Sequence, residues 1–182
     1  MARTGCPPEA LFAIGVGGFR TEAANQVQRG CVCALPPGRP LRYDRGMYET
    51  FDHTADLGLR IRAADLNTLF AEAAEALFSA VVEDLATVRP EQSIDVRVEG
   101  KDREYLLFDW LKALLYHFDV EHLLFSRFEV RVGEGGLEAK AWGEPLDRAR
   151  HELSHEVKAI TYHDLRVEQT PDGWEAEVIV DI

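Results

Sequence analysis

The sequence predicts a single α+β domain in which two main helices pack on a mixed, largely antiparallel sheet. Two segments repeat apolar residues every three to four positions, which is typical of amphipathic helices. Several shorter segments alternate apolar and polar residues, as half-buried strands do, and two pairs of them are joined by turns that predict hairpins. Because strands and helices do not follow the strict rhythm of parallel α/β folds, the α+β class is favoured.

The composition changes at Met47. Residues 1–46 hold all three cysteines, five of the eight prolines and a net charge of +3 from six Arg and three acids. They show no sustained periodicity. We expect residues 1–46 to be a disordered extension, or sequence upstream of a true start at Met47, and residues 47–182 to form the domain.

The first half of the domain predicts two strands and a helix. A short strand is expected at 47–51, and residues 57–63 alternate apolar and polar side chains as a half-buried strand does. Asp65 is a good N-cap for a helix that runs to about residue 82. Its leucines, alanines and Phe70 form one apolar stripe.

The second half adds a strand, a helix and two hairpins. Residues 93–99 alternate again. The helix at about 102–118 is apolar nearly all round, so we expect it to be deeply buried. Residues 125–142 and 159–182 each predict a hairpin, the first across a glycine-rich turn and the second across Thr170–Gly173.

Charge limits the partners of this domain. From Met47 onward the chain holds 29 acidic and 14 basic residues, a net charge of −15. Such a body repels a phosphate backbone, because binding to nucleic acid depends on basic groups. We therefore expect no direct nucleic-acid binding. Docking on a basic protein surface is favoured, including a surface that itself binds nucleic acid.

The cysteines and the hydropathy predict the compartment. The cysteine count is odd and the domain has none, so a disulfide framework is not expected and a reducing cytoplasm is favoured. No stretch approaches the roughly 20 apolar residues that a membrane helix needs. We expect a cytoplasmic protein without a membrane anchor.

Acidic groups form the candidate site. Asp52 and Asp56 frame a short polar segment between two strands, and Asp181 and the carboxylate of Ile182 close the last strand. If the fold joins them, several oxygen ligands meet, and hard divalent cations favour such ligands. Two alternatives stay open: Asp52 and Asp56 satisfy loop backbone in an Asx turn, or Asp181 faces outward from its strand.

The histidines offer weaker candidates. His151 and His155 match the His-Glu-x-x-His pattern of zinc proteases, which requires a stable helix and a third ligand. His163 is expected to alternate along a strand opposite Tyr162 and Asp164. A partly buried strand histidine is favoured there over a catalytic base.

The residues resemble the archease family. The resemblance covers residues 47–182 and leaves out residues 1–46. It rests on five blocks in the family's order and spacing: His53–Asp56 with Leu57 and Gly58, Leu106–Leu111, Gly143–Pro145, Glu156–His163 and Val180–Ile182.

The resemblance implies an archease-like fold and an accessory role to the RtcB-type RNA ligase, which uses GTP and metal to join tRNA halves in splicing and RNA repair. Such proteins promote guanylylation and multiple turnover of the ligase and are not themselves enzymes. The family's metal site maps onto Asp56, Asp181 and Ile182, usually with calcium, although magnesium or manganese also suit oxygen ligands. Lys158, His163 and Asp52 are candidate contacts with the ligase or its nucleotide.

Two other functions stay open. The same carboxylates suit a stand-alone metal-dependent phosphoester hydrolase with His163 as base. An acidic chaperone or adaptor, whose metal has no role, is the second alternative. Turnover without a ligase would favour the hydrolase, and partner stimulation that survives chelation would favour the adaptor.

Overall fold

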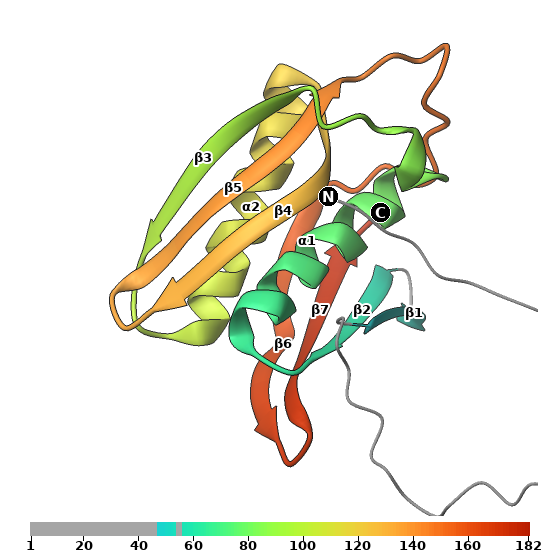
Figure 1. Cartoon of the computed structure of the whole chain (residues 1–182). Coiled ribbons are helices and arrows are strands. Elements are labelled where there is room, and N and C mark those ends of the chain that lie inside the picture. Colours follow the sequence, from blue (N-terminus) through green and yellow to red (C-terminus); the bar gives the residue numbers. More distant parts are fainter. Residues whose placement is uncertain (1–46, 54–55) are drawn as a thin grey trace, which may run out of the picture. The chain divides into compact units, whose positions relative to one another are not determined.

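The computed structural model describes residues 47–53 and 56–182 (Figure 1). The expectation for residues 1–46 lies outside the described residues, as do Thr54 and Ala55. The described part contains these elements in order: β1 (Met47–His53), β2 (Asp56–Ala63), α1 (Leu66–Val81), a short 3-10 helix η1 (Leu85–Thr87), β3 (Gln92–Glu99), α2 (Arg103–Glu121), β4 (Leu123–Gly133), β5 (Gly136–Pro145), β6 (Ala159–Thr170) and β7 (Gly173–Asp181).

The last strand lies in the middle of a four-stranded antiparallel sheet. The strand order is β1-β2-β7-β6, so β7 lies between β2 and β6. β2 pairs with β7 along its whole length, from Asp56 opposite Asp181 to Ala63 opposite Trp174. Leu59, Ile61 and Val178 are buried on the face that packs against α1. The other face carries the charged residues of these strands.

A second antiparallel sheet, ordered β3-β5-β4, completes the α+β fold. β4 has a bulge between Phe125 and Arg127, beside the pair that Phe125 forms with Gly143 of β5. A Cβ on Gly143 would overlap the carbonyl oxygen of Leu124. Because that neighbour is backbone rather than a flexible side chain, only glycine fits at position 143.

Helix α1 forms as its sequence predicts. The Oδ1 atom of Asp65 accepts a hydrogen bond from the backbone N–H of Thr68 at 3.0 Å, and its Oδ2 atom accepts from the Thr68 hydroxyl at 2.8 Å. The N–H donor of Thr68 is the main reason that the pKa of Asp65 lies below its usual value, since it stabilises the charged carboxylate. The predicted N-cap and apolar stripe are confirmed.

Helix α2 corrects one prediction. Its inner face is buried, and the indole Nε1–H of Trp110 donates to the carbonyl oxygen of Phe70 in α1 at 3.0 Å. Its outer face is open, and Tyr105, Tyr116 and Val120 are each more than half exposed. The expectation of burial all round is therefore wrong. The apolar pattern included Tyr105, but no described helix or sheet covers that face, apart from the contact of Tyr105 with Tyr162 in β6.

Both predicted hairpins are confirmed; β4, β5 and β6 are longer than expected, and β7 is shifted by one residue, ending at Asp181. β6 differs in one respect from the simple alternation that we expected. Its register with β7 shifts between Thr161 and Arg166, so residues 162–165 bulge out of the ladder, and Asp164 has a φ of 56°. None of the described helices is long and apolar enough to cross a membrane.

Candidate metal centre

Two carboxylates stand opposite each other at one end of the four-stranded sheet. Asp56 begins β2, Asp181 ends β7, and the two are direct partners in the antiparallel register. Directly opposed residues point to the same face, with their Cβ atoms about 4.5–5.5 Å apart. Both side chains are half-buried. The fold thus joins the two acids that the sequence placed 125 positions apart.

Two rows farther along β2 and β7, on the same face of the sheet, place opposite charges together. Arg60 stands opposite Glu177, with its Nε 2.7 Å from Oε1, and Arg62 stands opposite Glu175, with its Nε 2.6 Å from Oε2. Each of these β2–β7 rows pairs a cation with an acid. The row of Asp56 and Asp181 places two acids together instead. Since directly opposed like charges are destabilising, a cation bound between these two carboxylates would stabilise this row.

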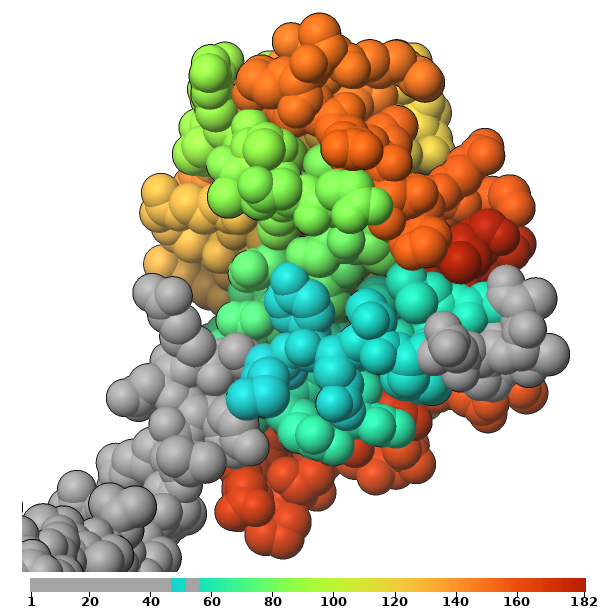
Figure 2. Space-filling view, turned by 90° about the vertical axis from the view of Figure 1, so that its right-hand side faces the viewer, coloured from blue at the N-terminus to red at the C-terminus, as the bar shows by residue number. Residues whose placement is uncertain are grey.

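The end of the chain is held beside the pair. The backbone N–H of Lys158 donates to the carbonyl oxygen of Asp181 at 2.8 Å, and Ala159 is the register partner of Asp181. The side chain of Ile182 is half-buried against the core. Figure 2 shows the end of β7 in dark red, beside the blue-green of β2 and the orange of the segment before β6. The backbone on both sides of Asp181 is therefore fixed.

The donor set fits a hard cation. Carboxylate oxygens favour calcium, magnesium or manganese over softer metals. Within residues 47–53 and 56–182, no three His, Cys, Asp or Glu side chains gather closely enough to hold an ion by themselves. Asp56 and Asp181 would thus require further oxygen ligands, such as the carboxylate of Ile182, water or a partner's groups. Calcium takes six to eight such ligands.

The other predicted site residues lie away from this row. Asp52 is the register partner of Leu57, one row along from Asp56, and its side chain lies outside the described residues. His163 lies in the β6 bulge, past the row that pairs Thr161 with Ile179. Its ring is largely exposed, with Nε2 3.2 Å from Oδ2 of Asp164. The expectation of a partly buried, alternating strand histidine is wrong, because the bulge breaks the alternation there.

The zinc-protease pattern is also contradicted. Residues 151–155 form no helix, so the required spacing of the two histidines on one helix face is absent. The ring of His151 is buried: its Nδ1 accepts from the backbone N–H of Asp147 at 3.1 Å, and its Nε2 lies 3.3 Å from Oε1 of Glu144. His155 is exposed, and its backbone N–H caps α1 by donating to Ala80.

Sequence reasoning missed the residue that organises this region. The side chain of Glu144 is only 3% exposed, yet it is charged. Its two oxygens accept from Nη1 and Nη2 of Arg150 at 2.7 and 2.6 Å, and Oε1 also accepts from the backbone N–H of Arg89 at 2.6 Å. The only signal in the sequence was the Gly-Glu-Pro block, in which an acid lies between two residues that restrict the backbone.

Glu144 anchors a connecting segment, residues 146–158, that we call the strap. The strap runs from β5 to β6 across the end of α1, where the N–H groups of Ser154 and His155 donate to the last carbonyls of that helix. Leu153 forms an isolated bridge with Val82. The strap ends at Lys158, whose N–H holds Asp181. Glu144 thus positions the carboxylate pair indirectly, through the strap.

The ion pair of Glu144 predicts a pH dependence. Hydrogen bonds from Arg150, opposed by burial, lower the pKa of Glu144 from 4.5 to about 2. Because the pKa in the folded state lies below the unfolded value, this stabilisation is complete above about pH 4.5 and is lost as the pH falls towards 2. We expect a loss of at most about 3 kcal/mol over that window. Urea unfolding at pH 6, 4 and 3 measures it, and Glu144→Gln is expected to flatten this part of the profile.

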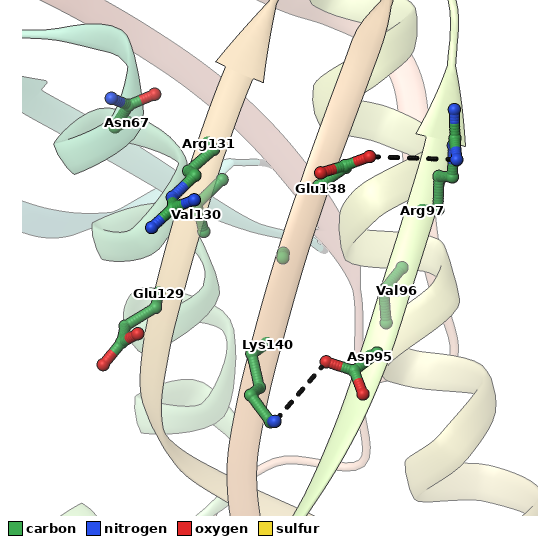
Figure 3. A pocket seen from close by; sticks show the side chains of 10 residues that line it. Asn67, Asp95, Val96, Arg97, Glu129, Val130, Arg131, Glu138 and Lys140 are labelled. Atoms are coloured by element: carbon green, nitrogen blue, oxygen red, sulfur yellow. Dashed lines mark ion pairs between the residues drawn. The ribbon is translucent and has the colours of Figure 1, made fainter.

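A hollow on the other sheet provides a contrast (Figure 3). It has a volume of about 640 Å³ and lies over the charged face of β3, β5 and β4. There Lys140 Nζ lies 3.7 Å from Oδ1 of Asp95, and Arg97 Nη1 lies 3.8 Å from Oε1 of Glu138. The opposed residues of β3 and β5 thus have opposite charges, so this hollow shows none of the like-charge opposition seen at Asp56 and Asp181.

The comparisons with known proteins agree with this architecture. Residues 48–182 match the family described as "Archease protein family (MTH1598/TM1083)". The chain is 41% identical over 137 residues to "Protein archease" of Sulfurisphaera tokodaii, covering 74% of this chain and 98% of that protein. It is 44% identical over 140 residues to "Protein archease" of Pyrococcus abyssi, with the same coverage.

A solved structure is similar over the same region. The solution structure of Methanobacterium thermoautotrophicum protein 1598 superposes with a TM-score of 0.67 at 36% identity, covering 74% of this chain and 98% of that one. The matched region corresponds in extent to the described domain. The chain belongs to the archease family.

Proposed function

We propose that this chain activates an RtcB-type RNA ligase, promoting its guanylylation and multiple turnover through a divalent cation held by Asp56, Asp181 and the carboxylate of Ile182. One observation carries the proposal: two aspartates oppose each other on a sheet face where two other β2–β7 rows pair Arg with Glu. Membership of the archease family supports the accessory role. The ligase, rather than this chain, uses GTP.

The cation requirement follows from the chain's own groups. Asp56 and Asp181 supply two carboxylates, and Ile182, whose side chain packs against the core, would supply a third. These groups do not complete the shell of calcium, so ligand positions stay open to a partner. A divalent ion at this place would neutralise phosphate charge during nucleotidyl transfer. Calcium suits the site, and magnesium or manganese are the alternatives.

Charge supports a protein partner over RNA itself. The domain from Met47 carries a net charge of −15, which disfavours a phosphate backbone and favours a basic protein surface. In this proposal the domain docks beside the RNA-binding site of the ligase and places its carboxylate pair towards the active site. The strap supports this placement, since the backbone N–H of Lys158 holds the carbonyl oxygen of Asp181 and the residue is exposed to a partner.

A ligation assay tests the proposal. Asp181→Asn, and a chain extended by one residue after Ile182, are each expected to reduce stimulation of multiple-turnover ligation to the rate of the ligase alone, because each removes an anionic ligand. Guanylylation of the ligase is measured in parallel with calcium, magnesium and manganese. Asp95→Asn is the matched control, since it removes the same charge from the exposed face of the other sheet and should keep full stimulation.

Full stimulation by both altered chains would contradict the cation site. Hydrolysis of a phosphoester by the purified chain without a ligase would contradict the accessory role.

A further inference from the structure

The outer face of α2 carries apolar surface that no described element covers. Tyr105 is 56% exposed and Tyr116 is 57% exposed, and Val120 follows one turn later. Phe108 lies between them at helical spacing and is half-buried. Residues three, four and seven positions apart share a helix face, so Tyr105 with Phe108 and Tyr116 with Val120 form one stripe, with the exposed Lys112 between the two pairs. Exposed aromatic stripes of this kind are typical of protein interfaces.

The β6 bulge extends this stripe. Tyr162 is 42% exposed, and its ring stacks on Tyr105 at a centroid distance of 4.9 Å. It also meets Phe108 edge to face at 5.7 Å. Bulges re-aim side chains and are frequent beside functional sites. Here the tyrosine at the start of the bulge lies against two rings of the helix. We call Tyr105, Phe108, Tyr116, Val120 and Tyr162 the aromatic surface.

Negative charge surrounds the aromatic surface. With its N-cap, α2 holds five acids and two cations, and Asp164 adds an acid from the bulge. The two cations already lie over rings, Arg103 over Trp174 at 4.5 Å and Lys112 over Phe108 at 5.8 Å. Desolvation, the adjacent Tyr105 and the nearby carboxylates raise the pKa of Tyr162 to about 12, so its phenol stays neutral. Exposed tyrosine rings fringed by carboxylates complement arginine and lysine side chains.

The aromatic surface lies close to the carboxylate pair. Tyr162 follows Ala159, the register partner of Asp181, by three residues, which corresponds to about 10 Å along a strand. A standard interface covers about 800 Å² on each partner, or roughly 30 Å across. Tyr162 packs on α2, whereas Asp181 alternates with the buried Val180 and points to the other face of the sheet. Because β6 is an edge strand, one partner can contact both residues by lying across this edge.

We infer that the aromatic surface is the docking site for a basic protein surface, the one through which this chain engages its RNA ligase. The inference rests on the proposed function for the identity of the partner. Tyrosines supply the buried anchors, and the surrounding acids pair with the partner's arginines and lysines. The carboxylate pair is then free to act at the active site rather than to hold the complex together.

Binding measured apart from stimulation tests this inference. Calorimetric titration of the full-length chain into the ligase is expected to show about a tenfold weaker affinity for Tyr162→Ser and for Tyr116→Ser, as anchor residues show. Affinity is also expected to fall with added salt. Met47→Ser is the matched control: it removes a side chain that is 54% exposed on β1, and affinity should stay within twofold. Tyr116 does not contact Tyr162 in the bulge, so Tyr116→Ser leaves the packing of the bulge on α2 unchanged. A weaker affinity of this variant therefore reports lost binding rather than a disturbed bulge.

The outcomes distinguish the docking site from the cation site. Asp181→Asn is expected to keep the affinity for the ligase while it loses stimulation. Tyrosine variants that bind within twofold of the unaltered chain, while Asp181→Asn still abolishes stimulation, would overturn the docking site alone. No complex with the ligase would overturn both proposals. Self-association lost in Tyr116→Ser, or RNA binding by the chain alone that depends on Tyr162, would assign the aromatic surface to a different occupant and overturn the inference.

Discussion

Calcium at a concentration one hundred times its dissociation constant is expected to stabilise the chain by about 2.7 kcal/mol, and Asp181→Asn is expected to remove this gain. Without the ion, the variant is expected to be more stable than the unaltered chain. The two carboxylates are opposed in register, and their repulsion at about 5 Å lies between about 1 and 3 kcal/mol for effective dielectric constants of water and of a protein surface. Asp181→Asn relieves it, so the ion-free variant is expected to be about 1 kcal/mol more stable.

Thermal unfolding with and without each divalent ion measures both effects. Sodium chloride at matched ionic strength controls for screening. Asp95→Asn should keep the calcium shift of the unaltered chain, because this acid lies on the exposed face of the other sheet. An equal calcium shift in Asp181→Asn would show that the ion binds elsewhere.

Glu144→Gln is expected to destabilise the fold by about 3 kcal/mol and to lower the melting temperature by roughly 10 °C. The substitution keeps the volume but removes the charge that accepts both guanidinium bonds of Arg150. Breaking a buried pair by changing one partner costs about 3–5 kcal/mol, and the partial exposure of Arg150 reduces that figure. The strap should loosen first, with faster amide exchange in residues 146–158.

The control for this prediction uses the same substitution on the surface. Glu138 is 71% exposed and its oxygen lies 3.8 Å from Arg97, so Glu138→Gln should change stability by less than about 0.5 kcal/mol. Urea midpoints at pH 7 compare the two variants. Equal midpoints would show that the strap is held by its backbone bonds to α1 alone.

Local pattern was sufficient for most of the fold. The cap at Asp65, the stripe of α1 and both hairpins depend on neighbours within a few residues, and the structure confirms them. The outer face of α2 was predicted wrongly, because burial depends on which layers the tertiary fold supplies. His163 was also predicted wrongly, on a regular strand rather than in a bulge. A bulge depends on the partner strand, which a local pattern does not include.

The candidate site could be predicted only in part. Asp56 and Asp181 were singled out as acids at strand ends, but the residues alone favoured an outward-facing Asp181, and only the family resemblance implied a shared site. The register places the two opposite each other. Asp52 carries the same side chain four residues earlier and lies in another row. The His151–His155 spacing matched a zinc motif, but spacing carries meaning only on a helix and none forms there. Glu144 stayed hidden because its partners Arg89 and Arg150 are separated from each other by sixty positions.

The position of β7 also determines how the protein folds. The strand at the centre of the four-stranded sheet is the last of the seven described strands, and β2, its neighbour, is the second. This pairing closes a loop of more than a hundred residues, and such non-local contacts give a high contact order and slow folding. Until β7 arrives, β2 and β6 expose unpaired edges that invite aggregation. Because Asp56 and Asp181 meet only at that closing step, a cation that requires both carboxylates could bind only once the sheet is complete.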